Sequence, residues 1–278
     1  MPRKMLGTGA YGAVKILRMD NKTFALKETQ VSNCPGKPEA THIHSLDEAA
    51  LTACLREEAM NLTHPHLIKR YWCRFWGTKH QICMELGKPV DHARPERILH
   101  DICQALYFMH SRGFIHRDVK PQNIVQVGNM YKLIDFGLSR KGDCTQALTG
   151  YMISRWFRPP ELLQADTFAN YDGRVDMYSL ALTAYYLDKG QPLFHGQDFD
   201  ILRMYRSYEP TGLYKHLICN YKDRYTSKQL LDACNVIPIE GGTMPKKKRV
   251  GKPALFVQCL LEGRSTAGCQ HDTIFEEL

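Results

Sequence analysis

Apolar and polar positions alternate in short stretches at the beginning of the chain. Residues 14–17 and 23–27 have this pattern on either side of Asp20-Asn21-Lys22, which is typical of two strands joined by a turn. Two further strands are expected at 68–75 and 79–84, where alternation returns. The pattern therefore predicts that the chain begins with β-structure.

Two other stretches have the spacing of helices. Ser45-Leu46-Asp47-Glu48 has the sequence of a capping box, which predicts a helix through about Leu62. A second helix is expected to begin at Pro95, because apolar residues then recur at helical intervals. These residues are Ile98, Ile102, Leu106 and Met109. We interpret His100 and His110, on this second helix, as structural residues.

Length and composition place the chain among ordinary globular proteins. Its 278 residues suit two small domains or one domain of two lobes. An apolar content of 44% and a charged content of 24% predict a real hydrophobic core. The formal charge of +8 favours phosphorylated or acidic partners, although the sign alone is equally compatible with nucleic acid.

The cysteines and the apolar runs bear on cellular location. The 10 cysteines are scattered without a Cys-x-x-Cys pair, which argues against a disulfide framework or a zinc site. The first residues contain no apolar core of a signal peptide. No apolar run approaches the roughly 18 residues of a membrane span. We therefore expect an intracellular protein in a reducing compartment, without a membrane partner.

Polar side chains that can act as acids, bases or metal ligands occur close together in the stretch Phe114–Val125. A histidine, an aspartate, a lysine and an asparagine lie within eight residues, between apolar runs that are too short for helices. This pattern indicates a loop between buried segments. A second acid, Asp135, ends the apolar run that follows. Because two acids and an amide on loops can bind divalent cations through oxygen, Asp118, Asn123 and Asp135 are candidate metal ligands.

A glycine-rich segment precedes the first predicted strand pair. Gly7-Thr8-Gly9-Ala10-Tyr11-Gly12-Ala13-Val14 has the pattern Gly-x-Gly-x-x-Gly-x-Val. Glycines allow backbone amides to approach phosphate oxygens without obstruction by Cβ. Dinucleotide-binding folds also carry such triplets, but there the glycines open a helix. Here two strands follow, which favours a hairpin over phosphates.

These motifs together resemble those of a known family. His116-Arg117-Asp118-Val119-Lys120-Pro121-Gln122-Asn123 and Asp135-Phe136-Gly137 resemble the catalytic and metal loops of eukaryotic-type protein kinases. Phe24-Ala25-Leu26-Lys27 resembles the kinase Val-Ala-Ile-Lys. Thr149-Gly150-Tyr151 and the block Arg155–Glu161 are similar to the lip of mitogen-activated kinases. The resemblance is to the mitogen-activated and cyclin-dependent kinase group, and it covers residues 5–234.

The resemblance implies an α+β, bilobal protein kinase fold. Residues 1–86 would form a small β-rich N-terminal lobe with one main helix, and 87–234 a larger helical C-terminal lobe. Residues 235–278 would form a tail, with 238–242 as a linker. The basic stretch 245–250 resembles a nuclear localisation signal, although a solvated charge run is equally compatible with it. We therefore expect location in the nucleus and/or the cytoplasm.

The resemblance also implies chemical roles. Asp118 would accept or orient the substrate hydroxyl proton, and Lys120 would contact the γ-phosphate of ATP. Asn123 and Asp135 would hold two Mg2+ ions. In the resembled family, a lysine at this position marks kinases that act on serine and threonine. His116 and Phe136 are expected to pack and to align the two loops.

Lys27 would pair with the α- and β-phosphates and with a helix glutamate. We favour Glu57 as this glutamate, while Glu58 remains open. Met84 would be the gatekeeper of the adenine pocket, and the Glu85 carbonyl and the Gly87 amide would bind adenine. The full set of expected nucleotide contacts is Leu6, Gly7, Gly9, Gly12, Val14, Ala25, Lys27, Met84, Glu85, Gly87 and Val125.

Two structural markers of the family are also present. Asp176 resembles the buried helix aspartate that anchors the catalytic loop. Arg224 resembles the arginine that pairs with a glutamate, here Glu161, and breaking such a buried pair from one side would cost about 3–5 kcal/mol. We further expect regulation by phosphorylation at Thr149 and Tyr151, with an always active enzyme as the alternative. Arg56, Arg117 and Arg140 would meet the first phosphate, and Arg155 and Arg158 the second.

The expected function is that of an ATP- and Mg2+-dependent serine/threonine protein kinase that is directed to sites followed by proline. Its partners would be protein substrates and an upstream activating kinase, and it would act as a monomer. The alternative is a pseudokinase-like scaffold that binds partners without catalysis. The presence of Lys27, Asp118, Asn123 and Asp135 argues against the scaffold. A nucleic-acid binder rests on charge alone, because the sequence contains no base-reading module.

Overall fold

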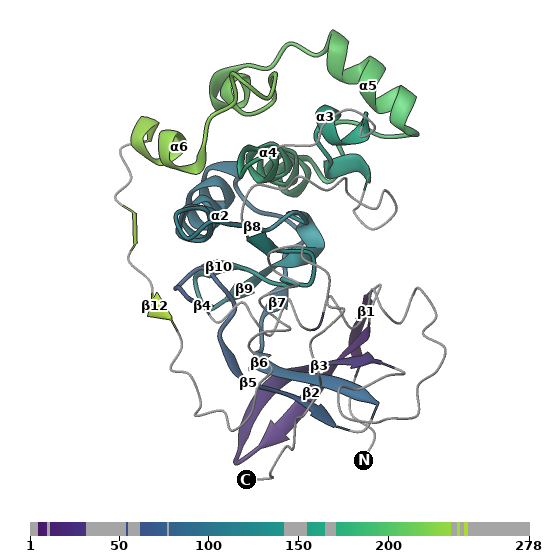
Figure 1. Cartoon of the computed structure of the whole chain (residues 1–278), viewed down its shortest axis with the longest axis vertical. Helices are drawn as coiled ribbons and strands as arrows, with labels where there is room; N and C mark the ends of the chain where they lie inside the picture. The colour runs from purple at the N-terminus through teal and green to yellow at the C-terminus, as the bar shows by residue number, and fades with distance from the viewer. Residues whose placement is uncertain are drawn as a thin grey trace, which may run out of the picture.

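The structure is a computed structural model that describes most of the chain up to residue 243. The described residues are 5–9, 12–31, 54, 62–76, 78–141, 155–164, 171–234, 238–239 and 242–243. A β-sheet formed by the beginning of the chain lies at one end of the molecule, and most of the helices lie at the other end (Figure 1). None of the helices in these ranges is long and apolar enough to cross a membrane.

The sheet is antiparallel, with the strand order β1-β2-β3-β6-β5. Its strands are β1 (Met5–Gly9), β2 (Gly12–Met19), β3 (Lys22–Gln30), β5 (Arg70–Trp76) and β6 (Lys79–Glu85). Asp20 and Asn21 connect β2 to β3 with φ values of 48° and 59°, a conformation that Asp and Asn tolerate in two-residue hairpin turns. The expected hairpin is confirmed. Its strands extend beyond the expected bounds because backbone pairing continues from Ala13–Glu28 to Met19–Lys22, whatever the polarity of the side chains.

The segment after the predicted first helix differs from expectation. Cys54 is helical, and the rest of the range 45–61 lies outside the described residues. Leu62 does not end a helix: it begins β4 (Leu62–Thr63), which pairs with β12 (Gly242–Thr243). The backbone N–H of Ile239 also donates to Gln104 Oε1 at 2.8 Å. The predicted linker at 238–242 is therefore partly docked on the body, because its backbone finds partners that a local pattern does not show.

The helical part contains four α-helices longer than one turn and several short elements among the described residues. The longer helices are α2 (Pro95–His110), α4 (Arg174–Lys189), α5 (Asp198–Ser207) and α6 (Ser227–Ala233). The short helices are α3 (Pro160–Leu163), η1 (Pro121–Asn123), η2 (Arg155–Phe157) and η3 (Gly212–His216). The short strands are β7 (Lys88–Pro89), β8 (Phe114–Ile115), β9 (Ile124–Val127), β10 (Met130–Leu133) and β11 (Arg140–Lys141).

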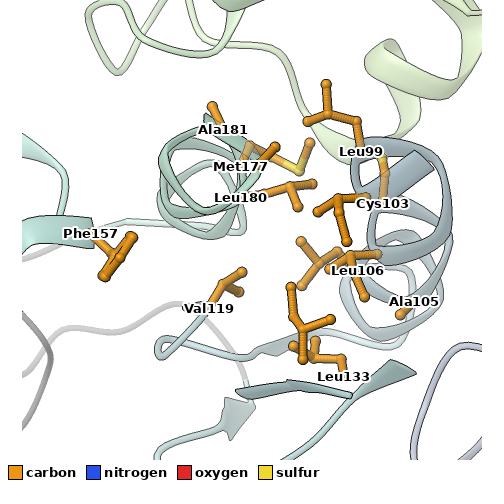
Figure 2. Close-up of a cluster of buried hydrophobic side chains, with 14 of the residues drawn as sticks. Leu99, Cys103, Ala105, Leu106, Val119, Leu133, Phe157, Met177, Leu180 and Ala181 are labelled. Carbon is orange, nitrogen blue, oxygen red and sulfur yellow. The ribbon is translucent and has the colours of Figure 1, made fainter. Parts of the chain in front are cut away.

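Helices α2 and α4 form the centre of the core, together with β10 and the loop before η1. The predicted helix that begins at Pro95 is confirmed, and its apolar face is buried. Figure 2 shows Leu106 of α2, Leu180 of α4, Leu133 of β10 and Val119 of the loop within one apolar cluster. Burial of such side chains contributes on the order of 1.5–3 kcal/mol each. The loop is thus attached to the best-packed part of the molecule.

The predicted ion pair between Glu161 and Arg224 is confirmed. Arg224 Nη1 lies 2.5 Å from Glu161 Oε1, and Nη2 lies 3.1 Å from Oε2. The guanidinium also donates to the carbonyl oxygens of Arg174 and Cys219 and lies over the Tyr178 ring. Since the Arg224 side chain is 0% exposed, this network replaces the water that the charge would otherwise bind.

Candidate active site

Asp176 holds the backbone of the loop that carries the candidate catalytic residues. Its carboxylate accepts hydrogen bonds from the backbone N–H groups of His116 at 2.8 Å and Arg117 at 2.7 Å, and from His110 Nε2 at 2.9 Å. Burial opposes ionisation, but these bonds and the nearby histidines keep the pKa of Asp176 below its ordinary value. Arg117 has a φ of 72°, a strained value that the bonds to Asp176 help to stabilise. The predicted anchoring role of Asp176 is confirmed.

Asp118 lies in this loop, and only one of its two carboxylate oxygens has hydrogen-bond partners among the described residues. Its Oδ2 lies 2.7 Å from Lys120 Nζ and accepts a hydrogen bond from Asn123 Nδ2 at 2.8 Å. Asn123 Nδ2 also donates to the Asp118 carbonyl at 2.8 Å. Asp118 Oδ1 is buried and has no hydrogen-bond partner among the described residues. Burial raises the pKa of Asp118, although the Lys120 charge acts in the opposite direction.

Asp135 lies across from this loop, immediately after β10. Its Oδ1 is 2.8 Å from Lys27 Nζ on β3, so the acid and the lysine link the loop to the sheet. Burial would raise the pKa of Asp135, but the charge of Lys27 and its hydrogen bond lower it overall. The expected glutamate partners of Lys27, Glu57 and Glu58, lie outside the described residues.

His116 connects the two loops. Its Nδ1 accepts a hydrogen bond from the Asp118 N–H at 3.2 Å, so its proton lies on Nε2, which donates to the Ile134 carbonyl at 3.1 Å. The ring also meets Phe136 edge to face, with 5.6 Å between centroids. The expectation that His116 and Phe136 pack and align the loops is confirmed. Together these contacts hold Asp118 and Asp135 in a fixed relation.

The structure brings several of the expected nucleotide contacts together in or against one apolar cluster. Ala25 and Met84 are register partners in β3 and β6, and both belong to the core cluster against which Val14 and Val125 pack. A Cβ on Gly87 would lie 2.5 Å from Val125 Cγ2, so only glycine fits there without movement. Leu6 differs from these residues, because it is 44% exposed near the open edge of the sheet.

The glycine-rich segment spans the connection from β1 to β2. Gly9 and Gly12 face each other in the register of these strands. A Cβ on Gly12 would lie 2.2 Å from the Glu28 carbonyl oxygen, whereas a Cβ on Gly7 would meet nothing within 4 Å. The two glycines therefore differ: Gly12 is required by the approach of β2 to β3, and Gly7 faces open space where a ligand could lie.

An ionic contact that the sequence pattern does not predict lies at the end of β6. Lys132 Nζ lies 2.6 Å from Glu85 Oε1, and the Lys69 N–H donates to the same oxygen at 2.7 Å. The sequence predicts a function only for the backbone of Glu85. The available signal is Lys132 itself, a charge directly before the apolar pair Leu133-Ile134 that precedes Asp135.

The arginines expected to bind phosphate after activation have varied surroundings. Thr149, Tyr151 and Arg56 lie outside the described residues. Arg155 Nε lies 3.0 Å from Asp198 Oδ1, and its guanidinium also donates to Gln197. Arg158 is buried, and this burial lowers its pKa. Arg140 pairs with Ile115 through the backbone of β11 and β8.

The comparisons with known proteins agree with this geometry. The family described as "Protein kinase domain" matches residues 2–234, and the chain belongs to that family. Its relatives include serine/threonine kinases of the cyclin-dependent and mitogen-activated types. The resemblance inferred from the motifs is therefore confirmed, as is the mixed α/β fold with an N-terminal antiparallel sheet. Membership of this family implies the use of ATP.

Three relatives illustrate the extent of the similarity. Cyclin-dependent kinase F-4 of Oryza sativa subsp. japonica is 37% identical over 201 residues, which cover 69% of this chain and 42% of that protein. Serine/threonine-protein kinase ICK of Rattus norvegicus is 29% identical over 201 residues, covering 69% and 31% respectively. Mitogen-activated protein kinase hog1 of Blastobotrys adeninivorans is 38% identical over 113 residues, covering 40% and 27%. The chain thus spans between 27% and 42% of the length of these relatives.

Proposed function

We propose that this chain transfers the γ-phosphate of ATP to serine or threonine hydroxyl groups of protein substrates. The observation that carries the proposal is the asymmetry of the Asp118 carboxylate. Oδ2 is held by Lys120 and Asn123, while the buried Oδ1 has no donor among the described residues. A buried carboxylate oxygen without a donor, in an otherwise well-bonded loop, keeps the capacity to accept a hydrogen bond from a substrate hydroxyl.

Asp118 would orient this hydroxyl and accept its proton. The hydroxyl oxygen forms a bond to the γ-phosphorus while the bond from that phosphorus to the β–γ bridging oxygen breaks, which leaves ADP. Because the proton leaves late in a loose transition state, the position of Asp118 matters more than its basicity. Lys120 would contact the phosphoryl group during transfer. Its positive charge would offset the repulsion between the Asp118 carboxylate and the phosphoryl oxygens.

Asn123 and Asp135 would hold Mg2+, which when bound neutralises charge on the β- and γ-phosphates. The residues fit this role. Asn123 turns its amide nitrogen to Asp118, which places its amide oxygen on the opposite side of the carboxamide, and the Asp135 side chain is 39% exposed. No group of three or more His, Cys, Asp or Glu side chains forms a metal site in the described part of the chain. Mg2+ suits such a sparse site, because it commonly uses one or two carboxylates together with substrate phosphates.

The nucleotide would lie between an N-terminal lobe of residues 1–86 and a C-terminal lobe of residues 87–234. Lys27, supported by Glu57, would contact its α- and β-phosphates. The glycine-rich segment would cover the phosphates with backbone amides, and the open space at Gly7 is compatible with this. The remaining contacts would be those expected from the sequence, with Met84 behind the adenine.

Regulation would act through the segment before α3. Phosphorylation of Thr149 and Tyr151 by an upstream kinase would add charge that arginines can bind. We extend the proposal to substrates with proline after the target residue, to a monomeric state, and to action in the nucleus and/or cytoplasm. The similarity to a mitogen-activated kinase supports the first of these, and the basic stretch 245–250 supports a nuclear location.

Label transfer from radiolabelled ATP to myelin basic protein or to a library of proline-containing peptides tests the proposal. We expect label on serine and threonine, and no transfer when Mg2+ is chelated. Melting with Mg-ATP separates an enzyme from a scaffold that does not bind nucleotide. At a hundredfold excess over Kd, we expect a rise of roughly 5–10 °C in Tm. A protein that neither binds Mg-ATP nor transfers label would contradict the proposal.

A further inference from the structure

A mostly buried ion pair connects the two halves of the molecule where β6 ends. Lys132 Nζ lies 2.6 Å from Glu85 Oε1, and their side chains are 8% and 14% exposed. The same carboxylate oxygen accepts the Lys69 N–H at 2.7 Å, and the Glu85 N–H donates to the Lys69 carbonyl at 2.9 Å. Glu85 is therefore held through both its side chain and its backbone.

The three residues belong to different parts of the fold. Lys69 immediately precedes β5 of the N-terminal sheet, Glu85 ends β6, and Lys132 lies in β10 of the helical part. Glu85 Oε1 thus contacts both the segment before β5, through the Lys69 N–H, and β10 of the helical part, through Lys132. If Lys132 is removed, Glu85 keeps its bond to Lys69 but loses the bond to the helical part.

The contact lies between the adenine side and the metal side of the proposed site. Lys132 pairs in register with Val125, the residue that Gly87 packs against, and its strand leads three residues later to Asp135. A shift of Glu85 relative to β10 would therefore change the distance between the proposed adenine contacts and the proposed metal ligand. Because both charges have lost most of their water, the pair favours one geometry over the alternatives.

We propose that Lys132 is a positioning residue for the nucleotide, acting through Glu85. By holding the Glu85 side chain, it fixes the backbone of Glu85 through Gly87 in the orientation that accepts adenine, before any nucleotide arrives. This inference rests on the proposed function, because it assigns the adenine contacts to that backbone. Such preorganisation lowers the cost of binding and affects affinity more than the chemical step.

The experiment compares Lys132→Met, Glu85→Gln and the double variant with wild type. Lys132→Met keeps the stem of the side chain, and Glu85→Gln keeps an acceptor for the Lys69 N–H. We expect the KM for ATP to rise about fivefold in each single variant, with kcat and the KM for a peptide substrate within about twofold of wild type. The double variant should resemble the worse single variant, because the two changes remove the same interaction.

Lys228→Met is the matched control, since it breaks the exposed pair between Lys228 and Asp232 on α6. It should leave the KM for ATP unchanged. An unchanged KM in Lys132→Met, a KM in the double variant that equals the product of the two single effects, or a fall in kcat alone would overturn the inference.

Two readouts without turnover separate this inference from the proposed function. Hydrogen exchange of the amides at residues 85–88 in nucleotide-free protein should become faster in Lys132→Met and stay unchanged in Lys228→Met. Calorimetric titration with ADP should show the same loss of affinity as KM does. If wild type binds ADP but transfers no phosphate, the proposed function fails while these two measurements still test Lys132. Equal exchange and equal ADP affinity in wild type and Lys132→Met would refute its positioning role.

Discussion

Lys27 Nζ lies 2.8 Å from Asp135 Oδ1, so β3 of the sheet is joined to the loop that follows β10. Both groups would contact a bound nucleotide: Lys27 would contact its phosphates directly, and Asp135 would contact them through a cation. In the nucleotide-free protein each neutralises the other. We infer that binding of Mg-ATP exchanges this direct pair for two contacts to the ligand.

Lys27→Met should therefore reduce phosphate transfer by about a hundredfold or more, because one cationic contact to the phosphates is lost. Its effect on Tm should be small, since exposed and partly exposed ion pairs contribute little to stability. Label transfer and melting in the absence of nucleotide measure the two effects. Lys22→Met, at the exposed start of the same strand, is the control and should behave as wild type. Transfer above a tenth of the wild-type rate would contradict the assigned role of Lys27.

The buried pair of Arg224 and Glu161 should be important for stability. Glu161→Ala leaves a fully buried guanidinium without its carboxylate, and Arg224→Ala also removes the donors to Arg174 and Cys219. We expect each change to lower the free energy of unfolding by about 3–5 kcal/mol. Urea denaturation measures the loss, with Lys228→Ala on the exposed face of α6 as a control without measurable effect. Wild-type midpoints in both variants would refute the pairing.

The comparison of sequence and structure shows which contacts a local pattern can reveal. The contact between Asp118 and Asn123 was predictable because both residues lie within one short motif. The contact of Lys132 with Glu85 was not, because the partners are 47 positions apart and a lone lysine in a strand usually faces solvent. Lys132 lies in the buried second half of β10, where its ammonium group needs a partner in place of water.

The docked tail was unpredictable for a related reason. A strand of two residues, Gly242–Thr243, has no periodicity to recognise, and its partner β4 lies about 180 residues earlier in the sequence. Resemblance to the family did not help, since the matched residues end at 234. The predicted helix was extended to Leu62 because local propensity does not include this distant strand pairing.

The tail should contribute measurably to stability. Ending the chain after Cys234 removes the Ile239 N–H from the buried Gln104 side chain and removes the partner of β4. Losing this hydrogen bond together with the pairing of β12 with β4 should lower the free energy of unfolding by about 1–3 kcal/mol. Urea denaturation measures this loss, and amide exchange at Leu62 and Thr63 should become faster. A chain that ends after Val250 keeps both contacts and serves as the control; equal stability of the two truncated proteins would contradict the docking.

Stability should fall in mildly acidic solution because of His80. Burial, with the positive charges of Lys27 and Arg70, lowers the pKa of His80 to about 4. The unfolded chain, in which a histidine titrates near its ordinary value of about 6.5, then binds more protons than the folded protein. The stabilisation is full above this ordinary value and is lost as the pH falls from about 6.5 to about 4. At pH 5 the loss amounts to about 1–2 kcal/mol.

His80→Leu should make the dependence of unfolding free energy on pH less steep in this window, as measured by urea denaturation at pH 7, 6 and 5. Burial also lowers the pKa of His64 to about 4. His64 remains in the variant, so part of the dependence of unfolding free energy on pH should remain. A slope that is identical in wild type and His80→Leu would contradict the depressed pKa.

The most direct test of the central claim is the rate of phosphate transfer by Asp118→Asn beside wild type, with Mg-ATP binding measured on the same samples. The change keeps the shape of the side chain but removes its capacity to accept the hydroxyl proton. We expect an unchanged rise of Tm with Mg-ATP and a rate at least about a hundredfold lower than that of wild type. Equal label incorporation by the two proteins would contradict the role of Asp118, and with it the proposed mechanism.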